Sequence, residues 1–493
     1  MLSSRCSQLQ CQAARQCQRR VAVSTQLGKG LRLSSPVTPI AQQDAQAGTV
    51  SSMQRTMHHL PTYSQRQRVV PGASAAASSD FPADVPAASS SLGTSTFPQA
   101  VLNVINVMCG VGLLSLPFAL KSSGWVGILL LWLMGFVANY TGKALVECAN
   151  EVSRRRQLVG QVVGYEEIAE EAFGKVGRAI VSAIIYVELF GTCCLLFILE
   201  GDNMFSLMGA KALAPIATNA SHYMLLAAAV MIPTVWLPNL SSLSFLGVFG
   251  VAATCAVVAS VAFTLCSGSF VAGAVTDPAL WATLPLVFGI MTFCYSGHGV
   301  FPAIQASMKT PEDFPQVLNV AYLAVTLLCT FVGMAGYHMY GSAAADVVIF
   351  NLPTALATVC SCLLLINPIA KFALTMEPVA NAATIAAGGG KPVSGLPRLA
   401  VRTAVSIAIL MAARSMPFLA YVMALVGSFM TISVSVTFPA LCHLILCSKT
   451  SSSGKKAWNW FVAGLGLTCT LAGTAASMKS LAAKAASSAA GLA

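Results

Sequence analysis

MTFCYSGHGVFPAIQASMKTP, at residues 291–311, is an apolar stretch of membrane-spanning length whose middle is broken by Ser-Gly-His-Gly. A helix in hydrocarbon satisfies its own backbone groups, so a break at mid-depth is tolerated only where it lines a cavity. Gly297 and Gly299 permit the backbone to unwind, and Pro302 removes a hydrogen-bond donor just beyond them. His298 brings a titratable ring to the same place. The stretch therefore predicts an interrupted membrane helix beside a cavity.

A second apolar stretch, NVMCGVGLLSLPFAL at 106–120, has the same arrangement in the first half of the chain. Gly112 precedes Pro117 by five residues, as Gly297 precedes Pro302. Two interrupted helices at corresponding places in two halves of a chain are typical of the binding site of a secondary transporter. The alternative is that these glycines only let helices pack closely, as small residues do in membranes.

The composition is that of an integral membrane protein. Of the 493 residues, 56% are hydrophobic and 9% are charged, whereas about a quarter of a soluble chain is charged. The 16 cysteines include no CxxC pair and no His/Cys spacing suited to a metal, so we interpret them as small packing residues. We expect a lipid bilayer around the chain, and no metal, cofactor or nucleic-acid partner.

The apolar runs predict an all-α polytopic fold with about eleven membrane spans. The expected spans cover 97–120, 124–149, 177–200, 222–238, 241–267, 281–306, 316–341, 354–378, 398–413, 416–447 and 457–477. Basic residues are enriched in loops on the cytosolic side of a membrane. Here they gather on the side of the amino terminus, among them Arg154, Arg155 and Arg156. We therefore expect the amino end in the cytosol.

Residues 1–96 differ from residues 97–493, which form the expected transmembrane domain. The first segment holds nine Lys or Arg, three Asp and no Glu, and it is rich in Ser, Gln and Ala. Such a segment cannot bury a core, so we expect a disordered, basic cytosolic tail. Its first 43 residues hold no acid, which is also typical of a mitochondrial or plastid transit peptide.

Several stretches after residue 97 resemble the amino acid/auxin permease (AAAP) family, especially its vacuolar and vesicular amino-acid transporter branch. The most specific is SGHGVFP at 296–302; the others include FPQAVLNVINVMCGVGLLSLPFALKSSGW, YEEIAEEAFGKVGR, VELFGTCCLLFILEGDN and INPIAKFALTMEPVA. The resemblance implies an eleven-helix fold of the LeuT type, a 5+5 inverted repeat with helices 1 and 6 broken. It also implies that the protein moves amino acids, often together with protons.

The two breaks define the expected substrate site. A free amino acid carries a carboxylate and an ammonium group, which suit the exposed ends of half-helices. The expected site residues are Asn106, Gly110, Val111, Gly112 and Leu113 in the first span, and Tyr295, Ser296, Gly297 and His298 in the sixth. No negatively charged site is obvious in the sequence, so neutral amino acids are the favoured substrates.

Three ionisable side chains within spans are candidates for proton coupling, because inserting one costs roughly 2.5–3.5 kcal/mol. Lys371 lies in the eighth span, and the LeuT resemblance implies that this helix meets the first at a cation site. The alternative is a lysine at the cytosolic interface or paired with Glu377. Glu188 and His298 are the other candidates, and a purely structural hydrogen-bonding role is the alternative for each.

Tyr421, Ser428 and Thr431 of the tenth span are expected to line the substrate path, although small polar residues also join helices. The sequence thus predicts a proton-coupled transporter of neutral amino acids with alternating access across a vacuolar or other endomembrane. A plastid or mitochondrial membrane stays open as an alternative. The main rival is an amino-acid-sensing receptor on a transporter fold, signalling through the tail. GxSxG and HExxH motifs are absent, which argues against an enzyme.

Overall fold

The computed structural model describes residues 93–158, 162–209, 219–237, 247–268, 270–271 and 274–490. Within these ranges the regular structure is helical, apart from one isolated bridge between Ser95 and Met308. The expected all-α class is confirmed. The basic tail expected at the amino end lies outside the described residues as far as residue 92.

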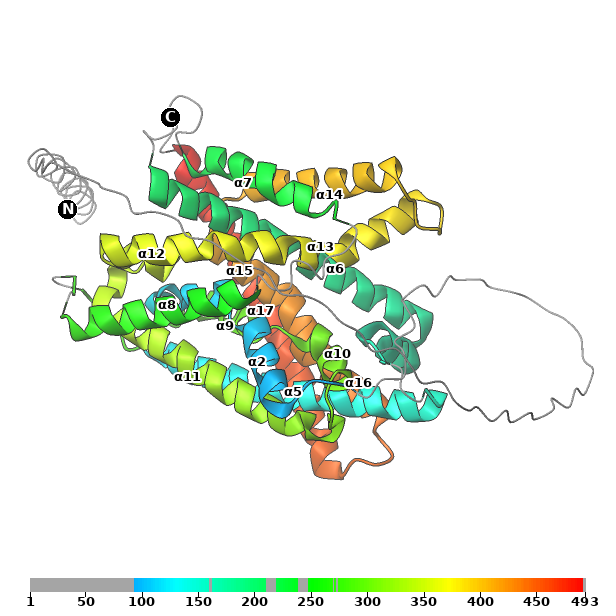
Figure 1. The fold of residues 1–493 in the computed structure, drawn as a ribbon. Coiled ribbons are helices and arrows are strands. Elements are labelled where there is room, and N and C mark those ends of the chain that lie inside the picture. Colours follow the sequence, from blue (N-terminus) through cyan, green and yellow to red (C-terminus); the bar gives the residue numbers. More distant parts are fainter. Residues whose placement is uncertain are drawn as a thin grey trace, which may run out of the picture. The chain divides into compact units, whose positions relative to one another are not determined.

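Figure 1 shows the helices along the chain. The first half contains α2 (Phe97–Met108), α3 (Val111–Leu114), α4 (Leu116–Ser123), α5 (Val126–Arg156), α6 (Tyr165–Met208), α7 (Ala220–Thr234) and α8 (Gly247–Cys266). The middle contains α9 (Leu284–Phe293), η2 (His298–Val300), α10 (Phe301–Ala306), η3 (Pro311–Asp313), α11 (Phe314–Tyr340), η4 (Gly341–Ala343) and η5 (Val348–Asn351). The last part contains α12 (Thr354–Leu364), α13 (Ile366–Ala387), α14 (Leu396–Ser415), α15 (Leu419–Val426), η6 (Gly427–Thr431), η7 (Ser433–Thr437), α16 (Phe438–Leu446) and α17 (Ser453–Ala490).

Eight helical stretches among the described residues are long and apolar enough to cross a membrane. They coincide with the expected second, third and sixth to eleventh spans. Three shorter apolar helices, α2, α7 and α8, lie where the first, fourth and fifth spans are expected. The number of crossings, about eleven, stays a prediction.

The start of the first span is fixed to the end of the sixth. The Thr96 N–H donates to Gln99 Oε1 at 2.9 Å, which satisfies one of the free donors at the start of α2. Just before it, the Ser95 N–H donates to Ser307 O and the Lys309 N–H donates to Ser95 O, both at 2.9 Å. The chain entering the first broken span therefore pairs with the chain leaving the second.

The amino-terminal part of α6 is a short amphipathic helix that ends in a bend at Gly174, where φ is +71°. Tyr165 and Ile168 on its apolar face are buried against the end of the tenth span. Its acidic face is paired, because Arg156 Nε lies 3.0 Å from Glu171 Oε2. The helix is thus held by burial on one side and ion pairs on the other.

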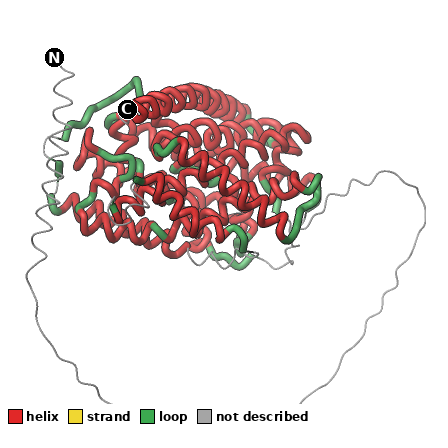
Figure 2. Tube along the Cα trace, turned by 90° about the horizontal axis from the view of Figure 1, so that it is seen from above, coloured by secondary structure: helices red, strands yellow, loops and turns green. Residues whose placement is uncertain are grey.

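The helices that carry the breaks are packed closely against their neighbours. α4 contacts α9 and α11, and α9 contacts α15, η6 and α17. A Cβ on Gly289 would lie 2.0 Å from Ala424 O, and one on Gly427 would lie 2.0 Å from Gly289 O. Backbone therefore meets backbone between α9 and the tenth span, as small residues allow in membrane bundles. Figure 2 shows this crowding of helices.

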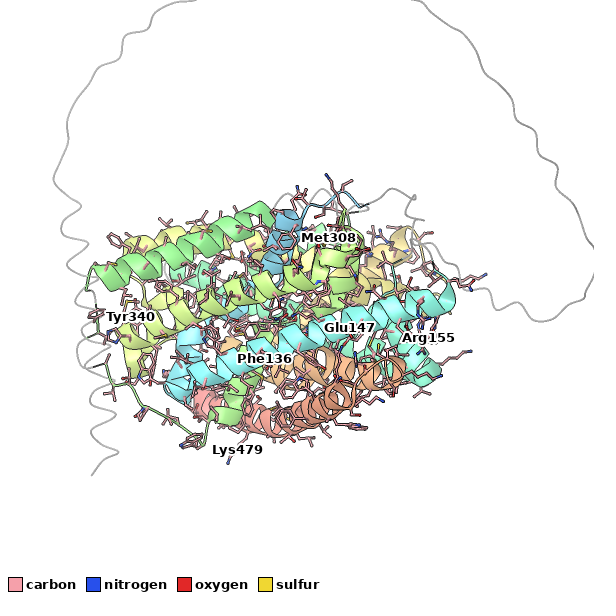
Figure 3. All side chains as sticks on the ribbon, turned by 90° about the horizontal axis from the view of Figure 1, so that it is seen from below. Phe136, Glu147, Arg155, Met308, Tyr340 and Lys479 are labelled. Carbon is pink, nitrogen blue, oxygen red and sulfur yellow. The ribbon has the colours of Figure 1, made fainter. Side chains whose placement is uncertain are left out.

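On the other side of the first break, α6 packs against α7, α12, α13 and α14, and α8 packs against α12. In Figure 1, α12 and α13 lie beside α6 and run antiparallel to it. Figure 3 places Tyr340 and Arg155 at opposite ends of the bundle. The residues near the breaks lie between these ends.

Candidate substrate site

The first break lies at Cys109 and Gly110. Cys109 is extended (φ −74°, ψ 102°) and Gly110 has φ −153° and ψ −142°, between the end of α2 and the start of α3. Gly112, the glycine emphasised by the spacing to proline, lies within α3 instead. A Cβ on Gly112 would lie 2.8 Å from Cys294 Sγ and 3.1 Å from Cys294 Cα. Gly112 therefore allows the two interrupted spans to approach closely.

The second break follows α9, at residues 294–297. The chain turns here, with the Tyr295 N–H donating to Thr292 O at 2.9 Å and the Ser296 N–H donating to Phe293 O at 3.2 Å. It then continues through the single turn η2 into α10. Interruptions of the first and sixth spans are therefore confirmed, and Gly112 and Cys294 bring the two together.

A small cavity, partly open to solvent, lies beside the first break. Its lining comes from the first, third, fifth and eighth spans: Gly110, Val111, Leu113, Leu114, Leu196, Leu199, Thr254, Val257, Leu364, Asn367, Pro368 and Lys371. Three of the expected site residues, Gly110, Val111 and Leu113, are among them. Those from the sixth span are not.

The sequence predicted Lys371 of the eighth span at this place, but it did not predict the other lining residues of the third, fifth and eighth spans. Only one of these segments carries a visible signal. Asn367-Pro368 places a polar side chain and a helix breaker within an apolar run, next to the seam where α12 gives way to α13. Leu196, Leu199 and Val257 are ordinary apolar residues, so nothing in the sequence distinguishes them from core residues.

Lys371 brings the one cationic side chain among the lining residues to the first break. Its Nζ lies 3.6 Å from the position that a Cβ would take on Gly110. Among the described residues, no carboxylate forms an ion pair with Lys371. Glu377, the partner considered from the sequence, instead accepts from Arg402 at 2.6 Å through each of its oxygens. The negative end of the α2 dipole, which lies next to Gly110, stabilises an ammonium at this place.

Glu188 joins three spans. Its Oε1 accepts hydrogen bonds from Ser296 Oγ at 3.3 Å and from Thr431 Oγ1 at 2.7 Å. The third span is thereby connected to the break in the sixth span and to η6 in the tenth. The structure brings these three predicted residues together, but it does not pair Glu188 with Lys371.

His298 faces α5 and not the cavity. Its Nε2 lies 3.1 Å from Ala138 O and 3.1 Å from Thr141 Oγ1, and the ring is 1% exposed. A carbonyl oxygen only accepts, so Nε2 carries the proton. Its Nδ1 has no partner among the described residues. The geometry places His298 as an anchor that holds the second break against α5.

The remaining predicted residues are not in the cavity lining. Tyr295 is fully buried, and its hydroxyl lies 2.9 Å from Thr326 Oγ1 on α11. Tyr421 makes an edge contact with the ring of Phe118 at 5.8 Å between centroids. Ser428 faces α17, because a Cβ on Gly473 would lie 2.8 Å from its Cβ. Asn106 is half-buried near the end of α2 and is not part of the cavity lining.

An all-helical membrane bundle whose first and sixth spans are both interrupted, the first beside a cavity, has the fold of LeuT-type transporters. Among solved structures, MhsT in complex with L-phenylalanine has a similar fold, with a TM-score of 0.50 and 12% sequence identity over 77% of this chain and 98% of that one. The chain belongs to the family described as transmembrane amino acid transporter protein, whose sequence profile matches residues 93–479.

Curated relatives come from plants and animals. Amino acid transporter AVT1B of Arabidopsis thaliana is 35% identical over 395 residues, which are 77% of this chain and 70% of the relative. The vesicular inhibitory amino acid transporter of Xenopus laevis is 24% identical over 389 residues, 72% of each chain. Among further Arabidopsis relatives the matched share of the relative ranges from 63% to 87%. The resemblance to the vacuolar and vesicular branch is thus confirmed.

Proposed function

We propose that this protein is a secondary active amino-acid transporter, coupled to protons and selective for neutral amino acids, which alternates access across an endomembrane. The observation that carries the proposal is the unwound backbone at Gly110 next to the Lys371 ammonium, both of which line a cavity shared with the third and fifth spans. Free backbone groups suit the two charged ends of an amino acid.

The cavity lining supports neutral substrates. Most of it is aliphatic, and its neutral polar groups are Thr254 and Asn367. None of the lining residues is a carboxylate that would pair with a cationic side chain. An apolar or small side chain would bury its surface here at about 25 cal/mol per Å².

Lys371 is the group we propose for proton coupling. As an ammonium it is held at the end of α2, where the free carbonyls carry partial negative charge. When it gives up its proton, this attraction is lost and the eighth span is free to move relative to the first. Proton release and rearrangement are thereby linked at one residue.

Glu188 and His298 are secondary candidates for coupling. Protonation of Glu188 would remove a charge from the hydrogen bonds that Ser296 and Thr431 donate, which weakens a link between the third, sixth and tenth spans. His298 would act through its unpartnered Nδ1. Tyr421 and Thr431 flank the route to the cavity from the tenth span.

An endomembrane location with a cytosolic amino end is part of the proposal. It is supported by the vesicular relative's name and by the basic residues on the side of the amino terminus. Residues 1–96 would then form a basic cytosolic tail. A vacuolar membrane is the first location to examine by microscopy of the tagged chain.

Reconstitution of the full chain in liposomes tests the function. An imposed proton gradient should drive the accumulation of a labelled neutral amino acid, and a protonophore should abolish it. Lys371→Met should lower this uptake about tenfold or more, equivalent to about 1.4 kcal/mol in the barrier. Lys143→Met is the control and should keep its uptake, because Lys143 lies on α5 and its Nζ donates a hydrogen bond to Asn319 Oδ1 at 2.5 Å. Uptake that is indifferent to the protonophore would contradict proton coupling.

A further inference from the structure

The cavity-lining face of α6 continues beyond the cavity as a polar stripe. Leu196 and Leu199 line the cavity. Glu200 follows Leu196 by four residues and Asn203 follows Leu199 by four, so all four side chains share one helix face. Glu200 is 2% exposed and Asn203 is fully buried. A carboxyl group and an amide are thus buried side by side on the helix that walls the cavity.

The facing helix carries a matching stripe. Leu364, the last residue of α12, lines the cavity together with Asn367 at the start of α13, and Ser361 precedes Leu364 by three residues on the same face of α12. Because α12 runs opposite to α6 (Figure 1), Ser361 and Asn203 both lie toward the end of the bundle at which α6 finishes. α6 and α12 are in contact.

The polar atoms of these stripes have no partners among the described residues. They are Glu200 Oε2, both amide atoms of Asn203, Ser361 Oγ and Asn367 Oδ1. A buried polar group without a hydrogen bond costs about 1–3 kcal/mol, and native proteins satisfy such groups with ordered water. Asn367 Oδ1 lies at the cavity, against Gly250 of α8, and the orphans of Glu200, Asn203 and Ser361 continue along the contacting helices α6 and α12. Together they point to a hydrated route that starts at the cavity.

We propose that water fills a track between α6 and α12 and connects Lys371 to Glu200, which exchanges protons with the compartment where α6 ends. This rests on the proposed coupling at Lys371 and extends it. In the transfer, the Glu200 carboxyl releases a proton to the nearest water, each water passes one proton on, and the Lys371 amine takes up the last. Glu200 is then reprotonated from the aqueous side.

The charged and titratable groups around Glu200 leave it free for this role. On the packed helices, Arg414 of α14 donates to Ser221 O at 3.3 Å, and Tyr223 of α7 donates to Gly209 O at 2.8 Å. The neighbouring helices α7, α13, α14 and α15 also carry His222, Lys371, Arg398, Tyr421 and the Glu377–Arg402 pair, and Asp202 lies on α6 itself. None of them forms an ion pair with Glu200 within the described residues.

Glu200→Gln in the full-length transporter tests the proposal. In liposomes the proton-driven uptake of a neutral amino acid should fall about tenfold or more, as expected when a proton-transfer group is removed. Exchange of internal for external amino acid at equal pH needs no net proton transfer, so it should stay within about twofold of the wild type. Asp202→Asn is the matched control, two residues away and off the stripe, and should retain both activities.

The outcomes separate the possibilities. Unchanged proton-driven uptake in Glu200→Gln would overturn the track, whereas a wild type with neither activity would overturn the proposed function instead. If Glu200→Gln does not fold, Ser361→Leu provides the second test, because its side chain would fill the route without touching the carboxyl. Proton-driven uptake should then fall and exchange should persist, and normal proton-driven uptake in Ser361→Leu would count against the proposal.

Discussion

Arg402 illustrates how single residues hold this bundle together. It is fully buried, and its guanidinium donates to both oxygens of Glu377 at 2.6 Å, to Asn381 Oδ1 at 2.7 Å and to Val235 O at 3.0 Å. A planar fork matched to a carboxylate fixes geometry as well as charge. The ninth, eighth and fourth spans are thereby joined at one side chain.

Removing this guanidinium should destabilise the fold. Arg402→Met is expected to lower the free energy of unfolding by about 3 kcal/mol, at the lower end for a broken buried pair because Glu377 keeps some contact with solvent. Thermal unfolding of the purified protein in detergent measures the change. The double variant Arg402→Met/Glu377→Met should recover most of the loss, and a double variant as unstable as the single one would contradict this reading.

Asp346, in the connection between α11 and α12, predicts a pH effect. Burial raises the pKa of its carboxyl, while the ammonium groups of Lys484 and Lys121 act in the opposite direction. The folded protein then holds this proton more tightly than the unfolded chain does. The stabilisation is therefore complete below the unfolded pKa of about 3.9 and is lost as pH rises through the folded pKa.

Asp346→Asn should accordingly raise the unfolding temperature at pH 7.5, and the gain should shrink as the pH is lowered toward 4.5. Differential scanning of wild type and variant across this range gives the comparison. A gain that grows on acidification would show that the lysines outweigh burial.

At the scale of elements, the sequence predicted both interruptions because glycine and proline within apolar runs have few other uses. It placed the first one within 106–120 but did not tell which glycine unwinds. The chain unwinds at Cys109–Gly110, while Gly112 permits the close approach to Cys294. Helix rotation was not predictable either. The sequence around His298 and Tyr295 does not indicate that these side chains point toward α5 and α11, because the packing of distant helices sets their direction.

The contact between α9 and the tenth span gives a prediction for an element. Gly289→Ala would place a Cβ 2.0 Å from Ala424 O, so the two backbones must separate, at an expected cost of about 1–3 kcal/mol. Gly464→Ala is the control, because that position on α17 has no atom within 4 Å and alanine favours a helix by about 1 kcal/mol. Unfolding temperatures should move in opposite directions, and equal shifts would refute the packing argument.

At the scale of the whole molecule, hydropathy and charge were sufficient for the membrane class and the positions of the spans. The cavity was only partly predictable, because many of the lining residues, such as Leu196, Leu199 and Val257, are of ordinary apolar type. What joins them at one place is the packing of helices far apart in the chain, which local patterns do not encode.

The amino-terminal segment provides a test of transporter against receptor. Deleting residues 1–92 leaves Ser95 and its hydrogen bonds to the end of the sixth span in place. Uptake per molecule in liposomes should therefore stay within about twofold of the full chain, while the location in cells should change. A well-folded truncated protein that no longer transports would favour the receptor.

The glycine contact between α9 and η6 also limits how the molecule can rearrange. The backbone atoms of α9 and the tenth span are in contact at Gly289 and Gly427. We therefore expect the first half of the sixth span and the start of the tenth to move as one rigid unit. Any rocking should then open at the cavity wall instead, where the first span meets α6 and Lys371.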